Sequence, residues 1–372
     1  MIVGVPTEIK TEEYRVAITP VGVRELTAHG HRVLIQKGAG NGSSLNDRDY
    51  RAVGAEIVSS AADVFADADM VLKVKEPQPT EIDMLGDSQI LFTYLHLAAY
   101  PEEAQGLIES GSTAIAYETV QLPGGELPLL APMSEIAGRL ATQAGAHHLE
   151  RPAGGRGLLI GGVAGVAPAR VVVLGAGNAG RNAAGIAAGM GAEVLVLDLN
   201  VDKLRNVDDI FHGRVITIRS SLHAIDELLP STDLVIGAVL VAGARAPVIV
   251  SEDHIESMRP GSVIVDISID QGGCIATASE TTHADPTYLV HDIVHYAVGN
   301  IPGAVPNTST YALTNATLPY TVALADGLPA AFEAHPELIS GVNVSGGAVT
   351  NLAVAEALGT DYTDPLAALG IS

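Results

Sequence analysis

The 372-residue chain has one cysteine, Cys274, no tryptophan, and only 4% aromatic residues. A single cysteine excludes an internal disulfide and fits a reducing compartment. With so few aromatic side chains, the cores must be filled mainly by Ala, Val, Ile and Leu, which suits buried parallel strands covered by helices. A nucleophilic role for Cys274 is the less favoured reading, because a free cysteine most often acts as a small apolar side chain.

Long apolar runs are also missing. Runs such as residues 157–169 and 234–244 are shorter than the roughly 20 residues that a membrane span requires, so we expect no transmembrane helix. The N-terminal segment is interrupted by Glu8 and Lys10 and lacks the features of a secretion signal. These absences predict a cytoplasmic protein.

Positive charge is scarce, since 20 Lys and Arg stand against 43 Asp and Glu, for a formal net charge of -23. Such a chain repels nucleic-acid phosphates and anionic membranes, so we expect neither as a partner. An anionic substrate would need cations gathered locally.

The apolar runs predict two α/β domains. Short runs in the first 120 residues alternate with helical patterns, at 2–6, 32–36, 70–75, 89–96 and 113–120. A second series follows, at 170–175, 193–198, 214–218, 233–240, 262–268 and 287–293. Strands that alternate with helices form parallel sheets, so the predicted fold is two Rossmann-like, doubly wound domains separated by a cleft.

Long helices are expected to link these domains. Residues 133–150 are predicted to form one helix that leads into the second domain, and residues 315–339, with Pro319 near the start, a helix that returns to the first. The predicted domains are therefore a discontinuous first domain, 1–132 plus 305–372, and a second domain, 133–304. The first helix is expected to start after Thr19, with Pro20 at its first position.

The ten residues VVVLGAGNAG carry a dinucleotide-binding pattern. Gly175, Gly177 and Gly180 have G-x-G-x-x-G spacing, directly after an apolar strand and before an Ala-rich helix. Gly175 allows a tight turn, Gly177 lets the backbone approach a pyrophosphate, and Gly180 lets helix and strand pack closely. The helix N-terminus at Asn178 and Ala179 then offers amides to the phosphates.

Asp198 ends the next predicted strand, where a carboxylate can accept hydrogen bonds from the adenosine ribose. Its charge would repel a 2′-phosphate, so NAD is favoured over NADP, although Lys203 and Arg205 lie close by in the sequence.

Ligands of open parallel sheets bind beyond the carboxyl ends of the strands. In the first domain this rule selects Arg15, Lys75 and His96, and in the second Asp270 and Asn300. Arg15 can bind a carboxylate through two hydrogen bonds, Lys75 can polarise a carbonyl oxygen, and His96 can transfer protons near neutral pH. Asp270 can orient water or amine at the reacting carbon. We expect the two clefts to face each other and form one active site.

Each of these residues also has a purely structural interpretation. His96 could be a hydrogen-bonded core histidine, and Lys75 with the following Glu76 a surface ion pair. Arg15 could only balance neighbouring acidic residues, and Asp270 could only end its strand at a turn.

Several blocks of the chain resemble the alanine dehydrogenase family. They are GVPTEIKTEEYRVAITP, VLKVKEP, LFTYLHLA, APMSEIAGRLA, GAGNAG, DISIDQGGC and VPNTSTYALTNATLPY, and they cover nearly the whole chain. The resemblance implies an NAD-dependent enzyme that interconverts L-alanine with pyruvate and ammonium. It also implies a homohexamer.

The resemblance further implies roles for individual residues. Arg15 and Lys75 would bind the substrate, and His96 and Asp270 would be catalytic. The implied cofactor contacts, besides the glycine loop and Asp270, are Ser134, Asp198, Lys203, Ser220, Val239, Leu240, Ile267, Val298, Asn300 and Ile301.

Two positions depart from other members of that family. Ser279 stands where some members carry an arginine near the cofactor, and Ala323 and Gly327 stand where some are described with a magnesium contact. Neither Ala323 nor Gly327 offers a ligand atom in its side chain, so no metal site is expected.

Two other functions remain open at the sequence level. The NAD-binding alpha subunit of a proton-translocating transhydrogenase resembles the same blocks, but a module that only exchanges hydride has no use for His96. A regulator that senses NAD without turnover would be marked by a broken catalytic set, which this chain does not have.

Overall fold

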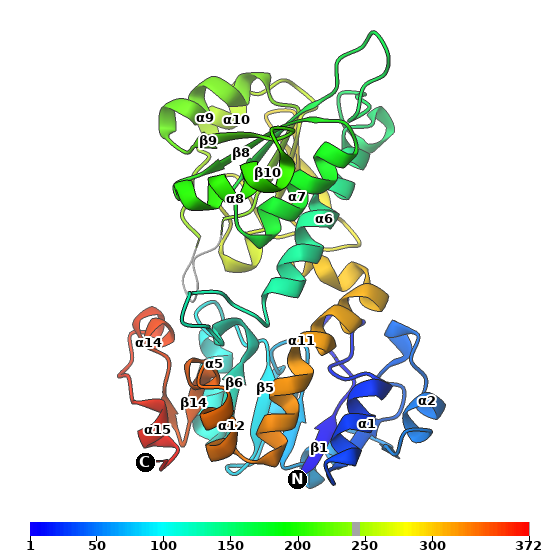
Figure 1. Ribbon diagram of the computed structural model, residues 1–372, viewed down its shortest axis with the longest axis vertical. Helices are drawn as coiled ribbons and strands as arrows, with labels where there is room; N and C mark the ends of the chain where they lie inside the picture. The colour runs from blue at the N-terminus through cyan, green and yellow to red at the C-terminus, as the bar shows by residue number, and fades with distance from the viewer. Residues whose placement is uncertain (240–245, 372) are drawn as a thin grey trace. The chain divides into compact units, whose positions relative to one another are not determined.

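The computed structural model of the protein describes residues 1–239 and 246–371. Its residues form two compact units (Figure 1): unit 1 comprises 1–133 and 303–371, and unit 2 comprises 134–239 and 246–302. Each unit is built on one mostly parallel sheet with helices, which confirms the predicted fold class.

The unit 1 sheet has the strand order β15-β14-β6-β5-β4-β1-β2-β3. Strands β1 to β6 are parallel, and β14 and β15 add an antiparallel edge. The five predicted strands are present, mostly shorter than expected, whereas β3, β14 and β15 were not predicted. The strands are β1 Ile2–Val5, β2 Arg32–Gln36, β3 Glu56–Val58, β4 Met70–Leu72, β5 Ile90–Thr93, β6 Thr113–Ala116, β14 Val342–Ser345 and β15 Ala348–Val349.

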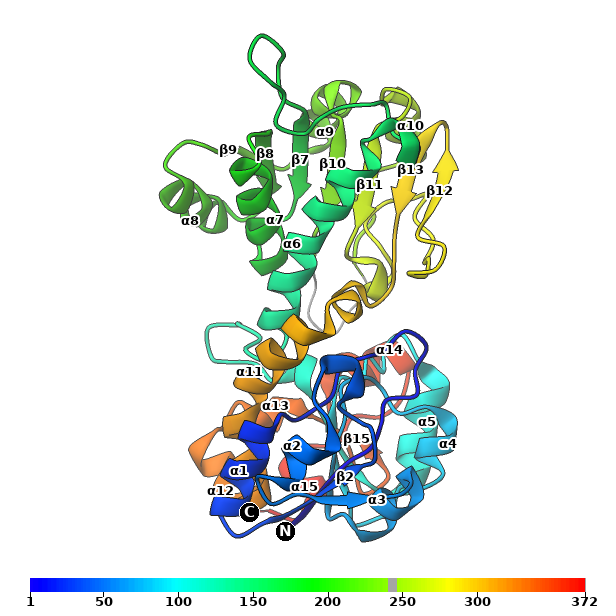
Figure 2. The ribbon, with the colours of Figure 1, turned by 90° about the vertical axis from the view of Figure 1, so that its right-hand side faces the viewer.

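Helices cover this sheet. Buried residues of α3 and α5 pack on one face with Val71 and Leu91, and α1 packs on β2 and α11 (Figure 2). As predicted, α1 begins after Thr19 with Pro20 in its first turn. The helices are α1 Pro20–Ala28, α2 Asp47–Arg51, α3 Ala61–Asp67, α4 Pro79–Ile82, α5 Pro101–Ser110, α11 Pro306–Asp326, α12 Leu328–Ala334, α13 Leu338–Gly341, α14 Leu352–Leu358 and α15 Pro365–Ala368, with 3-10 turns at Asn41–Ser43, Tyr117–Thr119 and Ile301–Ala304.

The predicted helix over 315–339 is wrong at both ends. Helix α11 begins at Pro306, where a proline fits the first turn, and Pro319 lies inside it. An internal proline costs a backbone hydrogen bond, but Leu313 and Leu324 on either side of Pro319 are completely buried, so packing holds both halves. Gly327, with a φ of +131°, then separates α11 from α12.

The unit 2 sheet has the order β12-β13-β11-β10-β7-β8-β9, and all its pairs are parallel except β12 with β13. The prediction of one strand over 287–293 is wrong, because the chain reverses there. His291 and Asp292 both have positive φ, 51° and 60°, as a two-residue hairpin turn requires. The strands are β7 Arg170–Leu174, β8 Glu193–Asp198, β9 Ile216–Arg219, β10 Leu234–Gly237, β11 Val263–Asp266, β12 Thr287–Val290 and β13 Ile293–Tyr296.

Unit 2 is covered on both faces. Buried residues of α6, α7 and α8 pack on one face of the sheet and those of α9 and α10 on the other (Figure 2). Its helices are α6 Ala131–His148, α7 Asn178–Gly189, α8 Val201–Phe211, α9 Leu222–Leu228 and α10 Glu252–Ser257, with 3-10 turns at Arg151–Ala153, Leu229–Ser231 and Ile269–Gln271. Across residues 1–239 and 246–371, no helix has both the length and the apolar character to cross a membrane.

One charged side chain lies deep inside unit 1. Lys73, just after β4, has a completely buried side chain and ion-pairs with Glu8 and Glu81, each at 2.8 Å. Burial on its own lowers the pKa of Lys73, but the attraction of the two carboxylates outweighs burial and raises it. Lys73 therefore stays charged and joins the loop after β1 to α4.

Replacing Lys73 by methionine is expected to lower the free energy of unfolding by about 3 to 5 kcal/mol, because two buried carboxylates lose their cation. Urea denaturation of the K73M variant measures this loss. The matched control is K37M, since Lys37 is exposed and its replacement should change stability by no more than about 0.5 kcal/mol. Equal urea midpoints for the two variants would show that the buried triad contributes little.

Candidate active site

Three neighbouring strands of unit 1 end next to the predicted substrate and acid–base residues. Arg15 follows β1, Lys75 follows β4 and His96 follows β5, and β4 lies between β5 and β1 in the sheet. Because these strands are parallel, the residues that follow them lie at one edge of the sheet. The observed strands end at Leu72 and Thr93, which leaves Lys75 and His96 in the connecting loops.

Arg15 is almost completely buried, with 2% of its surface exposed. Its Nε donates to Oε1 of Glu13 at 2.7 Å, and Nη1 donates to the sulfur of Met133 at 3.0 Å. Burial on its own lowers the pKa of Arg15, but the attraction of Glu13 outweighs burial and raises it. Arg15 does pair with a neighbouring acid, as the alternative interpretation assumed, and it is at the same time fixed at the carboxyl edge of the sheet.

Lys75 and Glu76 are both buried, at 5% and 2% exposure, so the interpretation as a surface ion pair is wrong. Oγ1 of Thr93 donates to the carbonyl oxygen of Lys75 at 2.9 Å and ties this loop to the end of β5. The carboxylate of Glu76 pairs with the ammonium of Lys10. The Glu76 carboxylate therefore has little contact with water and is neutralised by the ammonium of Lys10.

His96 has an unusual backbone conformation, with a φ of 51°, in the left-handed region that non-glycine residues rarely adopt. The carboxylate of Glu118 stabilises this conformation by accepting from the amide nitrogens of Leu95 and His96, at 3.1 and 2.6 Å. Glu118 Oε1 also lies 3.9 Å from Nδ1 of His96. The imidazole ring stacks on Tyr94, with ring centres 5.8 Å apart and planes within 8°.

Sequence reasoning missed Glu118 and Tyr94, and it considered Glu13 only as an acid whose charge Arg15 could balance. Glu118 follows β6, the next strand of the same sheet edge, so the rule that selected Arg15, Lys75 and His96 applies to it as well. Glu13 and Tyr94 had no comparable signal, because their role depends on side-chain contacts rather than on position along the chain.

The predicted dinucleotide loop of unit 2 connects β7 to α7. Gly175 has a φ of +107°, and a Cβ there would lie 2.4 Å from the carbonyl oxygen of Ala238. A Cβ at Gly180 would lie 1.8 Å from the carbonyl oxygen of Gly175. These two positions therefore need glycine for the fold itself.

Gly177 needs no glycine for packing, because a Cβ there would meet no described atom within 4 Å. The space in front of it adjoins the first turn of α7, which starts at Asn178 and has amides available for an anion. An open space at this point of the loop fits the pyrophosphate of a dinucleotide.

Asp198, at the end of β8, supports the same loop. Its Oδ2 accepts from the amide nitrogen of Ala176 at 2.7 Å, and Oδ1 accepts from that of Asn200, also at 2.7 Å. A carboxylate oxygen has two acceptor lone pairs, so Asp198 can also accept from ribose hydroxyl groups. Asn200 caps α8 and orients its first turn, which carries Lys203.

Asp270 and Asn300, predicted from two separate segments, are joined by a hydrogen bond from the Asn300 amide to Asp270 Oδ1, at 3.0 Å. Asn300 has a left-handed backbone, with a φ of 57°. Asp270 lies in a turn organised by buried Asp266, whose carboxylate accepts from the amides of Ser268 and Cys274 at 3.0 and 2.8 Å. Asp270 therefore does more than end a strand, because its carboxylate stabilises a second backbone turn.

The other predicted cofactor residues also lie in unit 2. Most of them follow strands of its sheet: Ser220 follows β9, Val239 follows β10, Ile267 follows β11, and Val298, Asn300 and Ile301 follow β13, while Ser134 lies in the first turn of α6. Ser220 donates its amide to the carbonyl oxygen of Asp198 at 2.9 Å. Leu240 lies outside the described residues.

Cys274 is completely buried and does not resemble a nucleophile. Burial raises the pKa of its thiol, and the neighbouring Asp266 raises it further. Because the thiolate is the reactive form, such a cysteine is chemically inert.

His29, His31 and Asp326 form the one group of metal-ligand type found in the described part of the chain. Nε2 of His31 lies 3.0 Å and Nδ1 of His29 3.3 Å from the Asp326 carboxylate, and Nδ1 of His31 lies 3.2 Å from the nitrogen of Met1. His31 precedes β2, at the amino edge of the sheet, opposite the edge that holds Arg15. Both ring nitrogens of His31 therefore have partners within the chain itself.

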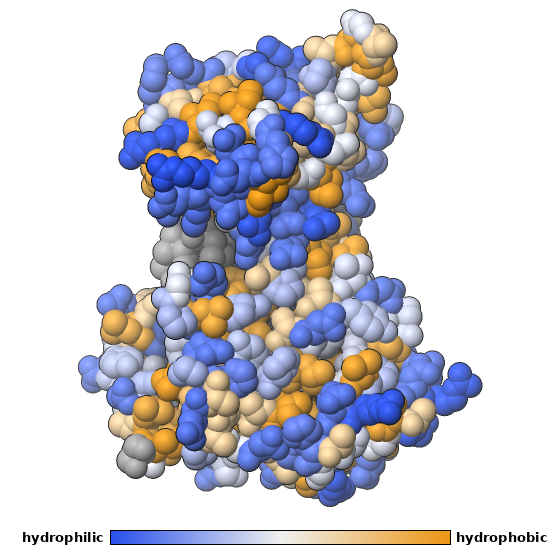
Figure 3. All heavy atoms as spheres, in the orientation of Figure 1, coloured by the Kyte–Doolittle hydropathy of each residue, from blue (hydrophilic) through white to orange (hydrophobic). Residues whose placement is uncertain are grey.

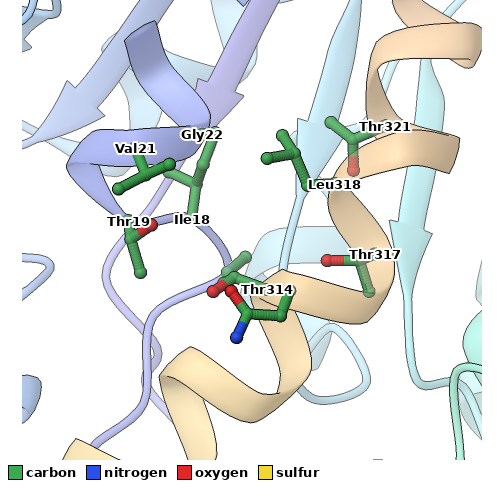
Figure 4. A pocket seen from close by; sticks show the side chains of 10 residues that line it. Ile18, Thr19, Val21, Gly22, Thr314, Thr317, Leu318 and Thr321 are labelled. Carbon is green, nitrogen blue, oxygen red and sulfur yellow. The ribbon is translucent and has the colours of Figure 1, made fainter. Parts of the chain in front are cut away.

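A small hollow lies between the start of α1 and the middle of α11, lined by residues such as Thr19, Val21, Thr314 and Thr317 (Figure 4). Its internal volume of about 10 Å³ matches about one water molecule. It is too small for an amino acid and holds none of the predicted site residues.

The chain matches known proteins along nearly its whole length. The family models "Alanine dehydrogenase/PNT, N-terminal domain" and "Alanine dehydrogenase/PNT, C-terminal domain" match residues 4–137 and 141–352. An alanine dehydrogenase of Mycobacterium tuberculosis is 56% identical over 370 residues, 99% of this chain and 100% of that protein.

Solved structures agree with the sequence matches. A structure titled L-alanine dehydrogenase has a TM-score of 0.91 and 50% identity and covers 96% of this chain and 99% of its own. A transhydrogenase structure from Sinorhizobium meliloti has a TM-score of 0.79 and 25% identity and covers 95% and 100%.

Replacing Gly177 by alanine is expected to leave the fold intact and to weaken NADH binding about tenfold or more, about 1.4 kcal/mol, because the new methyl group enters the open space in front of the loop. Nucleotide fluorescence titration measures binding, and thermal unfolding measures the fold.

The control for this variant is Gly189→Ala at the other end of α7, where a Cβ also meets no described atom within 4 Å. It should bind NADH like the unchanged protein. Normal binding by the Gly177 variant would mean that the pyrophosphate lies elsewhere.

Proposed function

The chain belongs to the alanine dehydrogenase/PNT family, and from this membership we propose that it is an L-alanine dehydrogenase, which converts L-alanine, NAD and water reversibly into pyruvate, ammonium, NADH and a proton. The observation that carries the proposal is the 56% identity over nearly the full length to an alanine dehydrogenase, in a chain whose Arg15, Lys75 and His96 follow three adjacent strands.

In this proposal Arg15 and Lys75 bind the substrate. The Arg15 guanidinium is held by Glu13, so its plane has a fixed direction and it can donate to a carboxylate with little loss of side-chain freedom. Lys75 follows the neighbouring strand and polarises the carbonyl oxygen of pyruvate. Both side chains are buried, which strengthens hydrogen bonds to an anion.

His96 transfers the protons. In the direction of deamination, oxidation of the alanine Cα–N bond gives an imine, water adds to it, and ammonia leaves. His96 takes a proton from the attacking water and returns one in the reverse reaction. Its backbone is held by Glu118 and its ring by Tyr94, so the imidazole is oriented before substrate binds.

The residues of unit 2 are proposed to hold the cofactor. When bound, NAD supplies the acceptor for the hydride that leaves the alanine Cα. The glycine loop and α7 bind the pyrophosphate, and Asp198 binds the adenosine ribose. The further cofactor contacts proposed are Ser134, Lys203, Ser220, Val239, Ile267, Val298, Asn300 and Ile301. Asp270 orients the water or amine at the reacting carbon and offsets the positive charge of the imine.

The transhydrogenase subunit is the weaker candidate. The solved transhydrogenase is 25% identical to this chain, half the identity of the L-alanine dehydrogenase structure. A histidine held in a left-handed turn by a buried carboxylate also serves proton transfer, which direct hydride exchange between nucleotides does not need.

The wild-type protein is expected to reduce NAD with L-alanine, followed by absorbance of NADH, and to give far less signal with NADP, L-serine or glycine. His96→Ala should lower kcat by about two to four powers of ten through the loss of acid–base catalysis, with NADH binding unchanged.

His147→Ala is the control for that variant, because the His147 side chain is 64% exposed on α6. It should retain full activity. Near-normal turnover by the His96 variant would refute the acid–base assignment, and wild-type protein without alanine-dependent reduction would refute the proposed function.

A homohexamer in the cytoplasm is the further part of the proposal. It rests on the family resemblance, and the single buried Cys274 fits a reducing compartment. A hairpin at residues 158–168 also exposes apolar side chains, with Leu159, Val163 and Val166 at 65, 59 and 62% exposure (Figure 3). Exposed apolar side chains that cluster on one hairpin are typical of a contact surface between protein chains.

Light scattering is expected to give the mass of six chains for the wild type and a smaller assembly for Val163→Asp, because the new charge would be buried. Leu222→Asp is the control, since Leu222 is 72% exposed at the start of α9. A monomeric wild-type protein would refute the hexamer.

A further inference from the structure

The loops that carry Arg15 and Lys75 are joined by two ion pairs of opposite polarity. Glu8, after β1, pairs with Lys73, after β4, at 2.8 Å. Lys10, two residues beyond Glu8, pairs with Glu76, three residues beyond Lys73. Glu8 also accepts from the amide of Val74 at 2.6 Å, so the two segments are fixed to each other along their length.

Of these four charged groups, Glu76 is the one with a buried oxygen that lacks a donor in the described part of the chain. It is 2% exposed, and its Oε2 has no hydrogen-bond partner among the residues that the structure describes. A buried carboxylate oxygen without a donor is unfavourable unless positive charge compensates it. Three cationic or ionisable groups act on Glu76: Lys10, Lys75 and His96.

Charge around Glu76 keeps it ionised. Burial on its own raises the pKa of Glu76, but the attraction of Lys75, His96 and Lys10 outweighs burial and lowers it. Lys10 is itself restrained, because its Nζ lies 5.3 Å from the centre of the Tyr100 ring. Glu76 is therefore a fixed negative charge beside two of the proposed active-site groups.

We propose that Glu76 is a positioning residue of the substrate site: held by Lys10, its buried carboxylate orients the ammonium of Lys75 and the imidazole of His96 toward the substrate. Lys75 and Glu76 are adjacent in a loop that Thr93 fixes to the end of β5, and His96 lies three residues beyond Thr93, so the three side chains belong to two loops joined at the same edge of the sheet. His96 is also restrained by the stacked ring of Tyr94, which follows the same strand β5, and by Glu118, which follows β6. This inference rests on the proposed function, because it assigns Lys75 and His96 to substrate.

The test is Glu76→Gln, which removes the charge and keeps the size of the side chain. We expect the KM for pyruvate to rise about tenfold or more and kcat to fall, because Lys75 and His96 both lose their orientation, while the KM for NADH stays within about twofold. Glu76→Asp keeps the charge and should recover part of both parameters. Lys10→Met should act in the same direction with a smaller effect.

Glu81→Gln is the matched control. Glu81 is also a buried carboxylate, at 1% exposure, and pairs with a lysine, Lys73, which keeps Glu8 as its second partner. This variant should lower the melting temperature without changing the KM for pyruvate. A Glu76→Gln variant with unchanged KM and kcat, or with equal losses for pyruvate and NADH, would overturn the inference.

Calorimetric titration with pyruvate in the presence of NADH separates this inference from the proposed function. Weaker pyruvate binding by Glu76→Gln than by Glu81→Gln supports the role of Glu76 even without turnover. If the wild type turns over alanine and both variants bind pyruvate equally, only the inference fails. If the wild type neither turns over alanine nor binds pyruvate, both fail.

Discussion

The carboxyl edge of the unit 1 sheet depends on neutralising buried positive charge. A site for a small carboxylic acid needs cations with little solvent around them, and a buried cation is stable only beside an anion. Arg15 is held by Glu13, Lys73 by Glu8 and Glu81, and Lys75 lies beside Glu76, which is itself held by Lys10. Two of these pairs, Glu8 with Lys73 and Lys10 with Glu76, also join the loops after β1 and β4, so ion pairs that allow charges to be buried fix the two loops to each other at the same time.

Residues with a strained backbone are stabilised by a carboxylate in both units. His96 and Asn300 have left-handed backbones that cost energy for a residue with a side chain, and in each case a carboxylate accepts from the amide of the strained residue. In unit 1 this carboxylate is Glu118, and in unit 2 it is Asp270. The strained turn is stabilised by an acidic residue from another segment, which keeps the side chain of the turn residue in one direction.

The sequence was sufficient to predict those features that depend on the periodicity of apolar residues and on the position of a residue at the end of a strand. Apolar runs located most strands, and strand ends located Arg15, Lys75, His96 and the glycine loop. Strand β14 escaped because it has no continuous apolar run, since Val342 and Val344 alternate with Asn343 and Ser345. The chain reversal at 291–292 escaped because it needs positive φ at a His-Asp pair, an uncommon choice. Glu118 was missed although it follows a strand of the same sheet edge, whereas the pairing of Glu76 with Lys10 comes from side-chain packing, which no spacing in the sequence reveals.

The balance of charge also explains how so acidic a chain can accept an anion. Three of its five lysines, at 10, 73 and 75, lie in the two loops that carry the proposed substrate residues, although the whole chain has a net charge of -23. Distant surface acids are screened by salt over about 10 Å, whereas buried groups are screened much less, so a substrate at this edge is influenced mainly by the buried groups of the site. Glu8, Glu13, Glu76 and Glu81 offset Lys10, Arg15, Lys73 and Lys75 one for one, so a substrate carboxylate gains directed hydrogen bonds rather than a large excess of positive charge. Such a site can bind an acid selectively and still release it, as a reaction that runs in both directions requires.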